Sequence, residues 1–107
     1  MGHSMGGEAS VKTATLPEAV KELNFKVAVA LAPAVMWVPT NHPEDIVIPT
    51  FFSTGSSDEE APAKGVEEAY DKDKFHDKVI VNIEGADHFE DIDTGRHRAC
   101  PYAMQFL

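Results

Sequence analysis

Three short runs along this chain are rich in apolar and β-branched residues and are separated by polar segments. The runs are FKVAVALA at residues 25–32, TFFST at 50–54 and KVIVNI at 78–83. The first run is β-branched and almost wholly apolar, which is typical of a strand buried on both faces of a parallel sheet. The pattern therefore predicts three strands that share one sheet.

The segment before the first run predicts two helices. Residues 8–15 are compatible with a helix that follows directly on the glycines near the amino terminus. A second helix is expected to begin at Thr15, whose hydroxyl would cap the exposed N–H groups, and to end near Asn24. Pro17 is tolerated in the first turn of such a helix, and Glu18 stands where a capping box has its acid.

The remaining segments alternate between loop and helix. Residues 33–49 hold four prolines and are predicted to form a long loop. A helix is expected from Pro62 to about residue 72, with Val66 and Ala69 on its apolar face. A final helix is expected over residues 101–107.

The alternation of strands and helices indicates an α/β layered fold with parallel strands and right-handed crossovers. In open sheets of this kind, chemically active groups gather at the carboxyl ends of the strands. Three loops follow a strand or the place where one is expected, and they read GHSMGG, GSSDEEAP and EGADHFE. They carry a serine, an acid and a histidine in turn.

Composition narrows the classes of partner. The 107 residues are enough for one domain at most, and 18 acidic against 9 basic residues give a net charge of −9. Such a surface is repelled by nucleic-acid phosphates and anionic lipids, so neither is expected as a partner.

The longest apolar run is too short to span a bilayer, and no secretory signal is recognised, which leaves the compartment undecided. The single Cys100 cannot form an internal disulfide and is expected to be a free thiol.

The run from Gly2 to Gly6 fits the pattern G-x-S-x-G, in which a serine stands on a sharp turn between a strand and a helix. Side chains at the two glycines would collide with the neighbouring backbone. The turn would leave Ser4 at a helix amino terminus, where the Met5 N–H points toward a developing oxyanion. The alternative interpretation is an ordinary glycine-rich turn.

A serine becomes a nucleophile only with a base to take its proton and an acid to orient that base. Ser4, Asp58 and His88 occur in the order serine, acid, histidine that accompanies a G-x-S-x-G turn. Glu59, Glu60 and Asp87 compete with Asp58 for the role of the acid. The histidines that compete with His88 are His3, His42, His76 and His97, of which His3 is expected to pack beside the serine. The five histidines lack the spacing of metal ligands, so no zinc site is expected. The serine chemistry implies no metal or organic cofactor.

Together, GHSMGG, GSSDEEAP and EGADHF resemble the α/β-hydrolase superfamily. The likeness is strongest to the branch that contains cutinase-like polyester hydrolases, chlorophyllases and dienelactone-hydrolase-like esterases. The resemblance implies that Ser4 is the nucleophile, Asp58 the triad acid and His88 the general base, and that the Met5 backbone supplies one oxyanion donor. Trp37 lies in a region that lines the substrate cleft in related esterases, although a packing role fits it equally well.

The resemblance covers the carboxyl-terminal half of that fold. It implies a three-layer α/β-hydrolase fold truncated to the helix after the serine and the last three parallel strands with flanking helices, all within one partial domain, residues 1–107. The strand that should precede Ser4 is expected to be missing, which would leave residues 25–32 as an open sheet edge available for self-association.

The predicted function is hydrolysis of small-molecule or polymeric carboxylic esters through an acyl-enzyme. The alternative is a catalytically inactive hydrolase fragment that acts, if at all, as a binding or interaction domain. A third hypothesis is a half-enzyme completed by another chain. Losing one oxyanion donor typically lowers turnover on the order of 100- to 1000-fold, which keeps the inactive alternative open.

Overall fold

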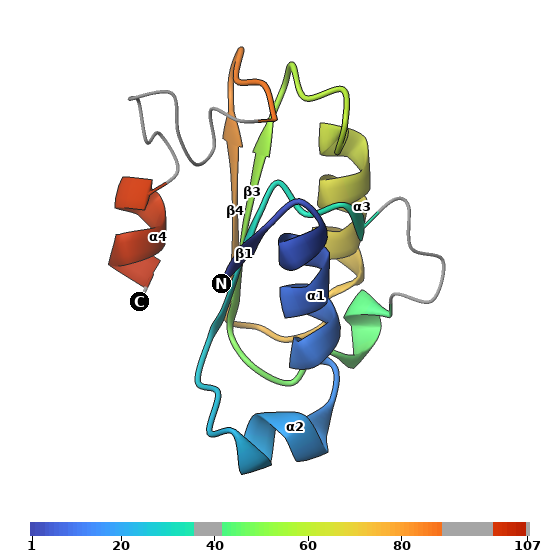
Figure 1. The fold of residues 1–107 in the computed structure, drawn as a ribbon, viewed down its shortest axis with the longest axis vertical. Helices are drawn as coiled ribbons and strands as arrows, with labels where there is room; N and C mark the ends of the chain where they lie inside the picture. Colours follow the sequence, from blue (N-terminus) through green and yellow to red (C-terminus); the bar gives the residue numbers. More distant parts are fainter. Residues whose placement is uncertain (36–41, 89–99, 107) are drawn as a thin grey trace.

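The computed structural model describes residues 1–35, 42–88 and 100–106. At its centre is a parallel sheet of four strands in the order β1-β2-β3-β4, so that strands adjacent in sequence are also adjacent in space (Figure 1). The strands are β1 Gly2–His3, β2 Ala28–Leu31, β3 Thr50–Gly55 and β4 Lys78–Ile83.

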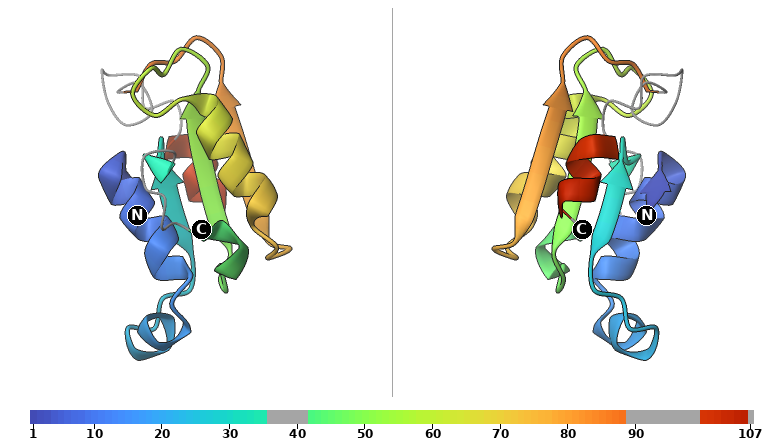
Figure 2. Two further views of the ribbon diagram at one scale, coloured as in Figure 1. Left: turned by 90° about the vertical axis from the view of Figure 1, so that its right-hand side faces the viewer. Right: turned by 90° about the vertical axis from the view of Figure 1, so that its left-hand side faces the viewer.

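Helices cover both faces of this sheet. α1 and α3 lie on one face and α4 on the other, as the two side views make clear (Figure 2). The bounds are α1 Met5–Ala14, α2 Pro17–Glu22, α3 Ala63–Lys72 and α4 Cys100–Phe106, with a 3-10 helix, η2, at Pro43–Asp45. The predicted layered α/β architecture is confirmed, and the three predicted strands are β2, β3 and β4.

The apolar core is divided between the two faces by the alternation of side chains along each strand. On β3, Phe52 packs with Val11 of α1 and Val66 of α3, while Phe51 faces the opposite side. There Phe51 packs in the same cluster as Ala103 of α4. Both phenylalanines are completely buried, which explains why the sequence of this strand is apolar at successive positions rather than at alternate ones.

The expectation that no strand precedes Ser4 is wrong. Gly2 and His3 form the short strand β1, which pairs in parallel with Ala30 and Leu31. The carboxyl half of β2 is therefore covered, and its amino half extends beyond β1 along the edge of the sheet. Self-association through this edge stays a prediction, now restricted to β1 and the first residues of β2.

The predicted helix boundaries need one correction. Thr15 does not cap α2, because it is the carboxyl-terminal cap of α1, where its backbone N–H and its hydroxyl both bond to the carbonyl of Lys12. α2 has Leu16 at its cap position with no side-chain cap hydrogen bond, and it ends at Glu22, close to the predicted end. In the part of the chain described, no helix is long and apolar enough to cross a membrane.

Candidate active site

Ser4 lies at the junction between β1 and α1 in an unusual backbone conformation. Its φ of 56° and ψ of −117° are rare for a residue with a side chain, and such conformations cost about 1–3 kcal/mol. Neighbouring backbone holds it in place: the Ser4 N–H donates to the Leu31 carbonyl, and its own carbonyl accepts from the N–H groups of Glu8 and Ala34, each at 3.0 Å. The strained residue is therefore fixed on both sides.

Glycines next to Ser4 permit this turn, but they are not equivalent. A Cβ on Gly2 would lie 2.1 Å from the Gly6 carbonyl oxygen, and one on Gly7 would lie 3.0 Å from the Cα of Pro33. A Cβ on Gly6 would meet nothing within 4 Å. The expected collision with backbone is therefore found at Gly2, whereas the Cβ position at Gly6 is open. Gly7 is the second constrained position.

Met5 is the first residue of α1, directly after Ser4. The first N–H groups of a helix have no acceptor within the helix, and the helix dipole places partial positive charge there. The Met5 N–H therefore lies next to Ser4, at the end of α1 where negative charge is stabilised. The side chain of Met5 is 72% exposed and lies outside the core.

Asp58 follows β3 and holds its carboxylate between two sets of donors. One oxygen, Oδ1, accepts the backbone N–H groups of Glu60 at 2.9 Å and Ala61 at 2.7 Å. The other oxygen, Oδ2, lies 2.8 Å from Nδ1 of His88. The side chains of Asp58 and His88 are 0% and 6% exposed, so this pair is shielded from water.

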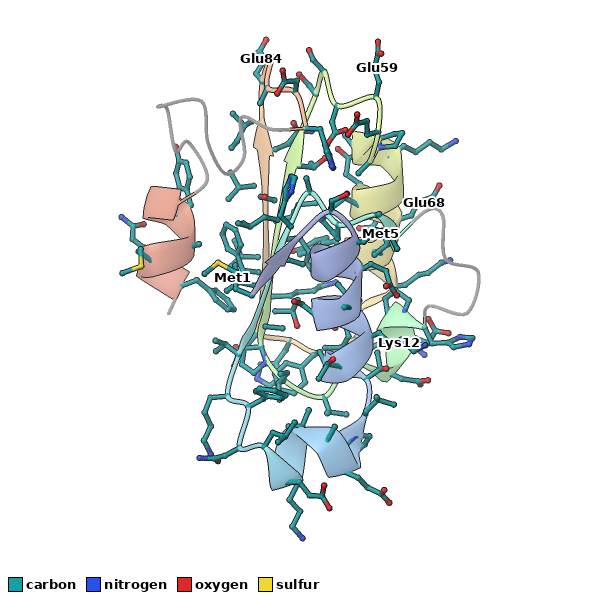
Figure 3. The ribbon with its side chains drawn as sticks, viewed as in Figure 1. Met1, Met5, Lys12, Glu59, Glu68 and Glu84 are labelled. Carbon is teal, nitrogen blue, oxygen red and sulfur yellow. The ribbon has the colours of Figure 1, made fainter. Side chains whose placement is uncertain are left out.

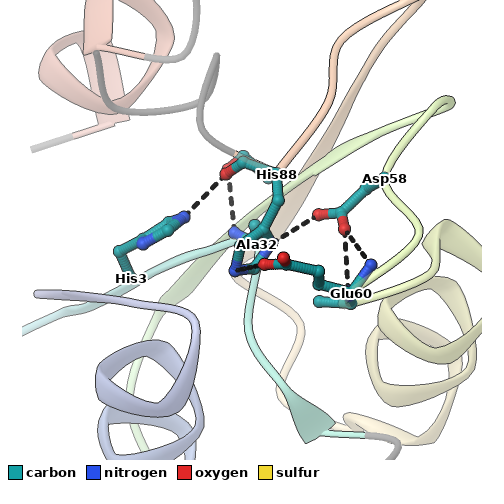
Figure 4. Close-up of polar contacts among 7 residues, drawn as sticks. His3, Ala32, Asp58, Glu60 and His88 are labelled. Carbon is teal, nitrogen blue, oxygen red and sulfur yellow. Dashed lines mark hydrogen bonds and ion pairs between the residues drawn. The ribbon is translucent and has the colours of Figure 1, made fainter.

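The orientation of His88 follows from this contact. An ionised carboxylate only accepts hydrogen bonds, so Nδ1 of His88 carries the hydrogen and donates it to Asp58. In the neutral ring, Nε2 then carries the lone pair that can accept a proton. A carboxylate oxygen of Glu60, Oε2, lies 3.5 Å from this nitrogen, and Figure 4 shows the Glu60 side chain extending toward the ring.

His3 joins the turn of Ser4 to the loop of His88. Its Nε2 donates to the carbonyl oxygen of His88 at 2.7 Å, and the two imidazole rings lie 4.5 Å apart between centroids (Figure 4). Because His3 directly precedes Ser4, this contact brings the serine turn and the Asp58–His88 pair to one end of the sheet. Among the contacts of the described residues, none joins the Ser4 hydroxyl to His88 directly.

The loops after β3 and β4 are tied to each other as well. The Ser57 N–H donates to the Ala86 carbonyl at 3.0 Å, and the Gly85 N–H donates to the Ser56 hydroxyl at 2.6 Å. A Cβ on Gly55 would lie 2.3 Å from the Ala86 carbonyl oxygen, so the close approach of the two loops requires glycine at that position. These contacts join the two loops that carry Asp58 and His88.

The competing candidates lie elsewhere or play other parts. Asp87, although adjacent to His88 in sequence, is exposed. His42 pairs with Glu44, and His76 stacks on Phe75, both at the surface. Trp37 and His97 fall outside the described residues, as do all side-chain details of Cys100. From the sequence, Glu60 is considered only as a rival of Asp58, and its contact with Nε2 of His88 is not predicted. The one signal for this contact is that Glu60 follows Asp58 by two residues in a turn.

A groove runs beside α1, between this helix and the first residues of β2. It is lined by small and apolar residues, among them Gly6, Ala9, Thr13, Phe25 and Ala28. It contains none of Ser4, Asp58 and His88, so we do not place substrate chemistry there.

No protein-family model matches the chain, and no curated protein matches it. Solved structures do. A monoacylglycerol lipase of Paleococcus ferrophilus is 16% identical with a TM-score of 0.74 over 96% of this chain and 64% of its own. An esterase of Pyrococcus furiosus is 17% identical, with a TM-score of 0.78, and the match covers 99% of this chain and 51% of the esterase. A predicted hydrolase of Thermoplasma acidophilum is 24% identical, with a TM-score of 0.76, and the match covers 100% of this chain and 48% of the hydrolase.

These similarities show the fold. The chain has the architecture of part of an α/β-hydrolase fold, shared with esterases, lipases and other hydrolases. It spans between 48% and 64% of the length of the three structures just described. Activity, substrate and partners are therefore proposals, because one fold supports many functions.

Proposed function

We propose that this chain carries the catalytic residues of a serine hydrolase that cleaves carboxylic esters through an acyl-enzyme. The observation that carries the proposal is the buried Asp58–His88 hydrogen bond of 2.8 Å, which leaves Nε2 of His88 as the proton-accepting nitrogen. Ser4 supports it independently, since a strained non-glycine residue between a strand and a helix is typical of functional sites.

In the proposed reaction, the Ser4 hydroxyl oxygen attacks the ester carbonyl carbon while His88 Nε2 accepts the hydroxyl proton. The resulting tetrahedral intermediate collapses, the bond to the alcohol oxygen breaks, and Nε2 delivers its proton to that oxygen. Water then attacks the acyl-enzyme and loses its proton to Nε2. The free carboxylic acid leaves and Ser4 recovers its hydrogen. Asp58 holds the imidazole in one tautomer and stabilises it when it is charged.

The Met5 N–H is proposed as one donor to the oxyanion of the tetrahedral intermediate. It follows Ser4 at the amino end of a ten-residue helix, where backbone N–H groups and the helix dipole both favour negative charge. A single donor of this kind is typically worth about 100- to 1000-fold in turnover. The cutinase-like assignment and a substrate-binding role for Trp37 stay predictions.

The test is hydrolysis of a p-nitrophenyl ester by the purified chain beside a Ser4→Ala variant, together with labelling by a fluorophosphonate. Ester cleavage that disappears in Ser4→Ala, and a label mapped to Ser4 by mass spectrometry, would support the proposal. Equal rates in the two proteins would refute it and favour a non-catalytic binding domain.

A further inference from the structure

We propose that Glu60 is a specificity-determining residue that selects esters whose leaving alcohol carries a positive charge. This inference rests on the proposed function and concerns the same site. It starts from the position of the Glu60 carboxylate, whose Oε2 lies 3.5 Å from Nε2 of His88.

Glu60 is held in this position by the same turn that orients the catalytic acid. Its backbone N–H donates to Oδ1 of Asp58 at 2.9 Å, while the other oxygen of Asp58 bonds to His88. Any conformation that keeps the Asp58–His88 pair therefore keeps the Glu60 backbone beside the imidazole.

The side chains of Glu60 and Asp58 differ in their exposure to solvent. The Asp58 side chain is completely buried, whereas that of Glu60 is 64% exposed. Its carboxylate thus lies between His88 and solvent and places a negative charge beside Nε2. At 3.5 Å the contact is longer than an ordinary hydrogen bond of about 2.7–3.2 Å, so its effect is chiefly that of a nearby charge.

The chemistry decides which part of a substrate meets this charge. During formation of the acyl-enzyme, Nε2 of His88 gives its proton to the oxygen of the leaving alcohol. The alcohol group must therefore pass close to Nε2 and so to the Glu60 carboxylate. A cationic alcohol, such as an amino or quaternary ammonium alcohol, is attracted there, and an anionic alcohol is repelled.

A neighbouring residue provides a matched control. Glu59 lies in the same loop, is exposed and extends into solvent at the end of the molecule where β3 ends (Figure 3). Glu59→Gln removes the same charge from the same loop as Glu60→Gln does. A difference between the two variants therefore reports position rather than the net charge of −9.

The experiment compares three butyrate esters that share one acyl group. They are choline butyrate, its neutral carbon analogue 3,3-dimethylbutyl butyrate, and the anionic 3-sulfopropyl butyrate, each followed in a pH-stat. We expect kcat/KM of the wild-type chain to fall in that order. Glu60→Gln should lower the ratio of cationic to neutral ester roughly fivefold to tenfold, and Glu60→Lys should reverse the order. Glu59→Gln and Glu59→Lys should leave both ratios within about twofold.

The remaining outcomes overturn the inference in distinguishable ways. Equal changes of the ratio in the Glu59 and Glu60 variants would mean that long-range charge, and not Glu60, sets selectivity. Equal acceleration of all three esters by Glu60→Gln would mean that Glu60 acts on His88 and not on substrate. Either result leaves the proposed function intact, whereas wild-type rates no higher than those of Ser4→Ala on every ester would refute the function and this inference together.

Discussion

Nε2 of His3 lies 2.7 Å from the carbonyl oxygen of His88, and the two residues are 85 positions apart in the chain. A carbonyl can only accept, so His3 donates this hydrogen bond and its tautomer is set by it. The contact links the turn of Ser4 directly to the loop of His88. His3 therefore acts as a positioning residue for the proposed pair of serine and histidine.

His3→Phe should lower the rate of serine acylation with little effect on KM. The ring contact with His88 is retained, but the hydrogen bond, worth about 0.5–1.5 kcal/mol, is lost. We expect a decrease of roughly threefold to tenfold in the rate of fluorophosphonate labelling of Ser4. His42→Phe, at an exposed histidine, is the control. A labelling rate equal to that of the control would show that His3 only fills space.

Asp58→Asn should abolish most esterase activity while the protein remains folded. An amide can donate to Nδ1 of His88 and so favours the wrong tautomer, and the corresponding change in serine proteases costs on the order of 10⁴ in kcat. Asp87→Asn removes an acid adjacent to His88 in sequence but exposed, and we expect it to retain nearly full activity. Greater loss in Asp87→Asn than in Asp58→Asn would exchange the roles of the two acids.

The sequence predicted the larger elements because their signals are repeated along several residues. Phe51 and Phe52 are adjacent and apolar, so in a strand they face opposite sides, and β3 has helices packed on both faces. β1 could not be found in this way, because two residues carry no periodicity. Its pairing with Ala30 and Leu31 depends on where β2 lies after folding.

At the site, too, the sequence predicted some contacts and not others. Asp58 and His88 each follow a strand of one parallel sheet, so their meeting follows from topology. The contacts of His3 and Glu60 with His88 depend on side-chain rotamers and on the turn after Asp58. The sequence gives little information on either of these contacts, apart from the offset of two residues between Asp58 and Glu60.

Gly2→Ala and Gly6→Ala should affect stability in opposite directions. A Cβ at position 2 would lie 2.1 Å from a backbone oxygen, and overpacking of this kind costs about 1–3 kcal/mol. A Cβ at position 6 meets nothing, and alanine in a helix is favoured over glycine by up to about 1 kcal/mol. Urea denaturation followed by circular dichroism measures both. A destabilised Gly6→Ala variant would contradict the open space described at that position.

Asp73→Asn should stabilise the protein at neutral pH and lose this advantage in acid. Burial raises the pKa of the Asp73 carboxyl, although the Phe75 N–H and the charge of Lys78 act in the opposite direction. A carboxyl whose pKa is higher in the folded state than in the unfolded state binds its proton more tightly when folded. Stability from that proton is therefore present below the unfolded pKa and is lost as the pH rises through the folded pKa.

At pH 7 the ionised Asp73 thus opposes folding, and one of its oxygens, Oδ2, is buried with no hydrogen-bond partner among the described residues. Asparagine is neutral and keeps an oxygen to accept the Phe75 N–H that now donates to Oδ1 at 2.9 Å. We expect a higher urea midpoint for Asp73→Asn than for wild type at pH 7, with the difference vanishing below about pH 4. Asp71→Asn, two residues away and exposed, is the control. An advantage of Asp73→Asn that grows as the pH falls would contradict the assigned direction of the pKa shift.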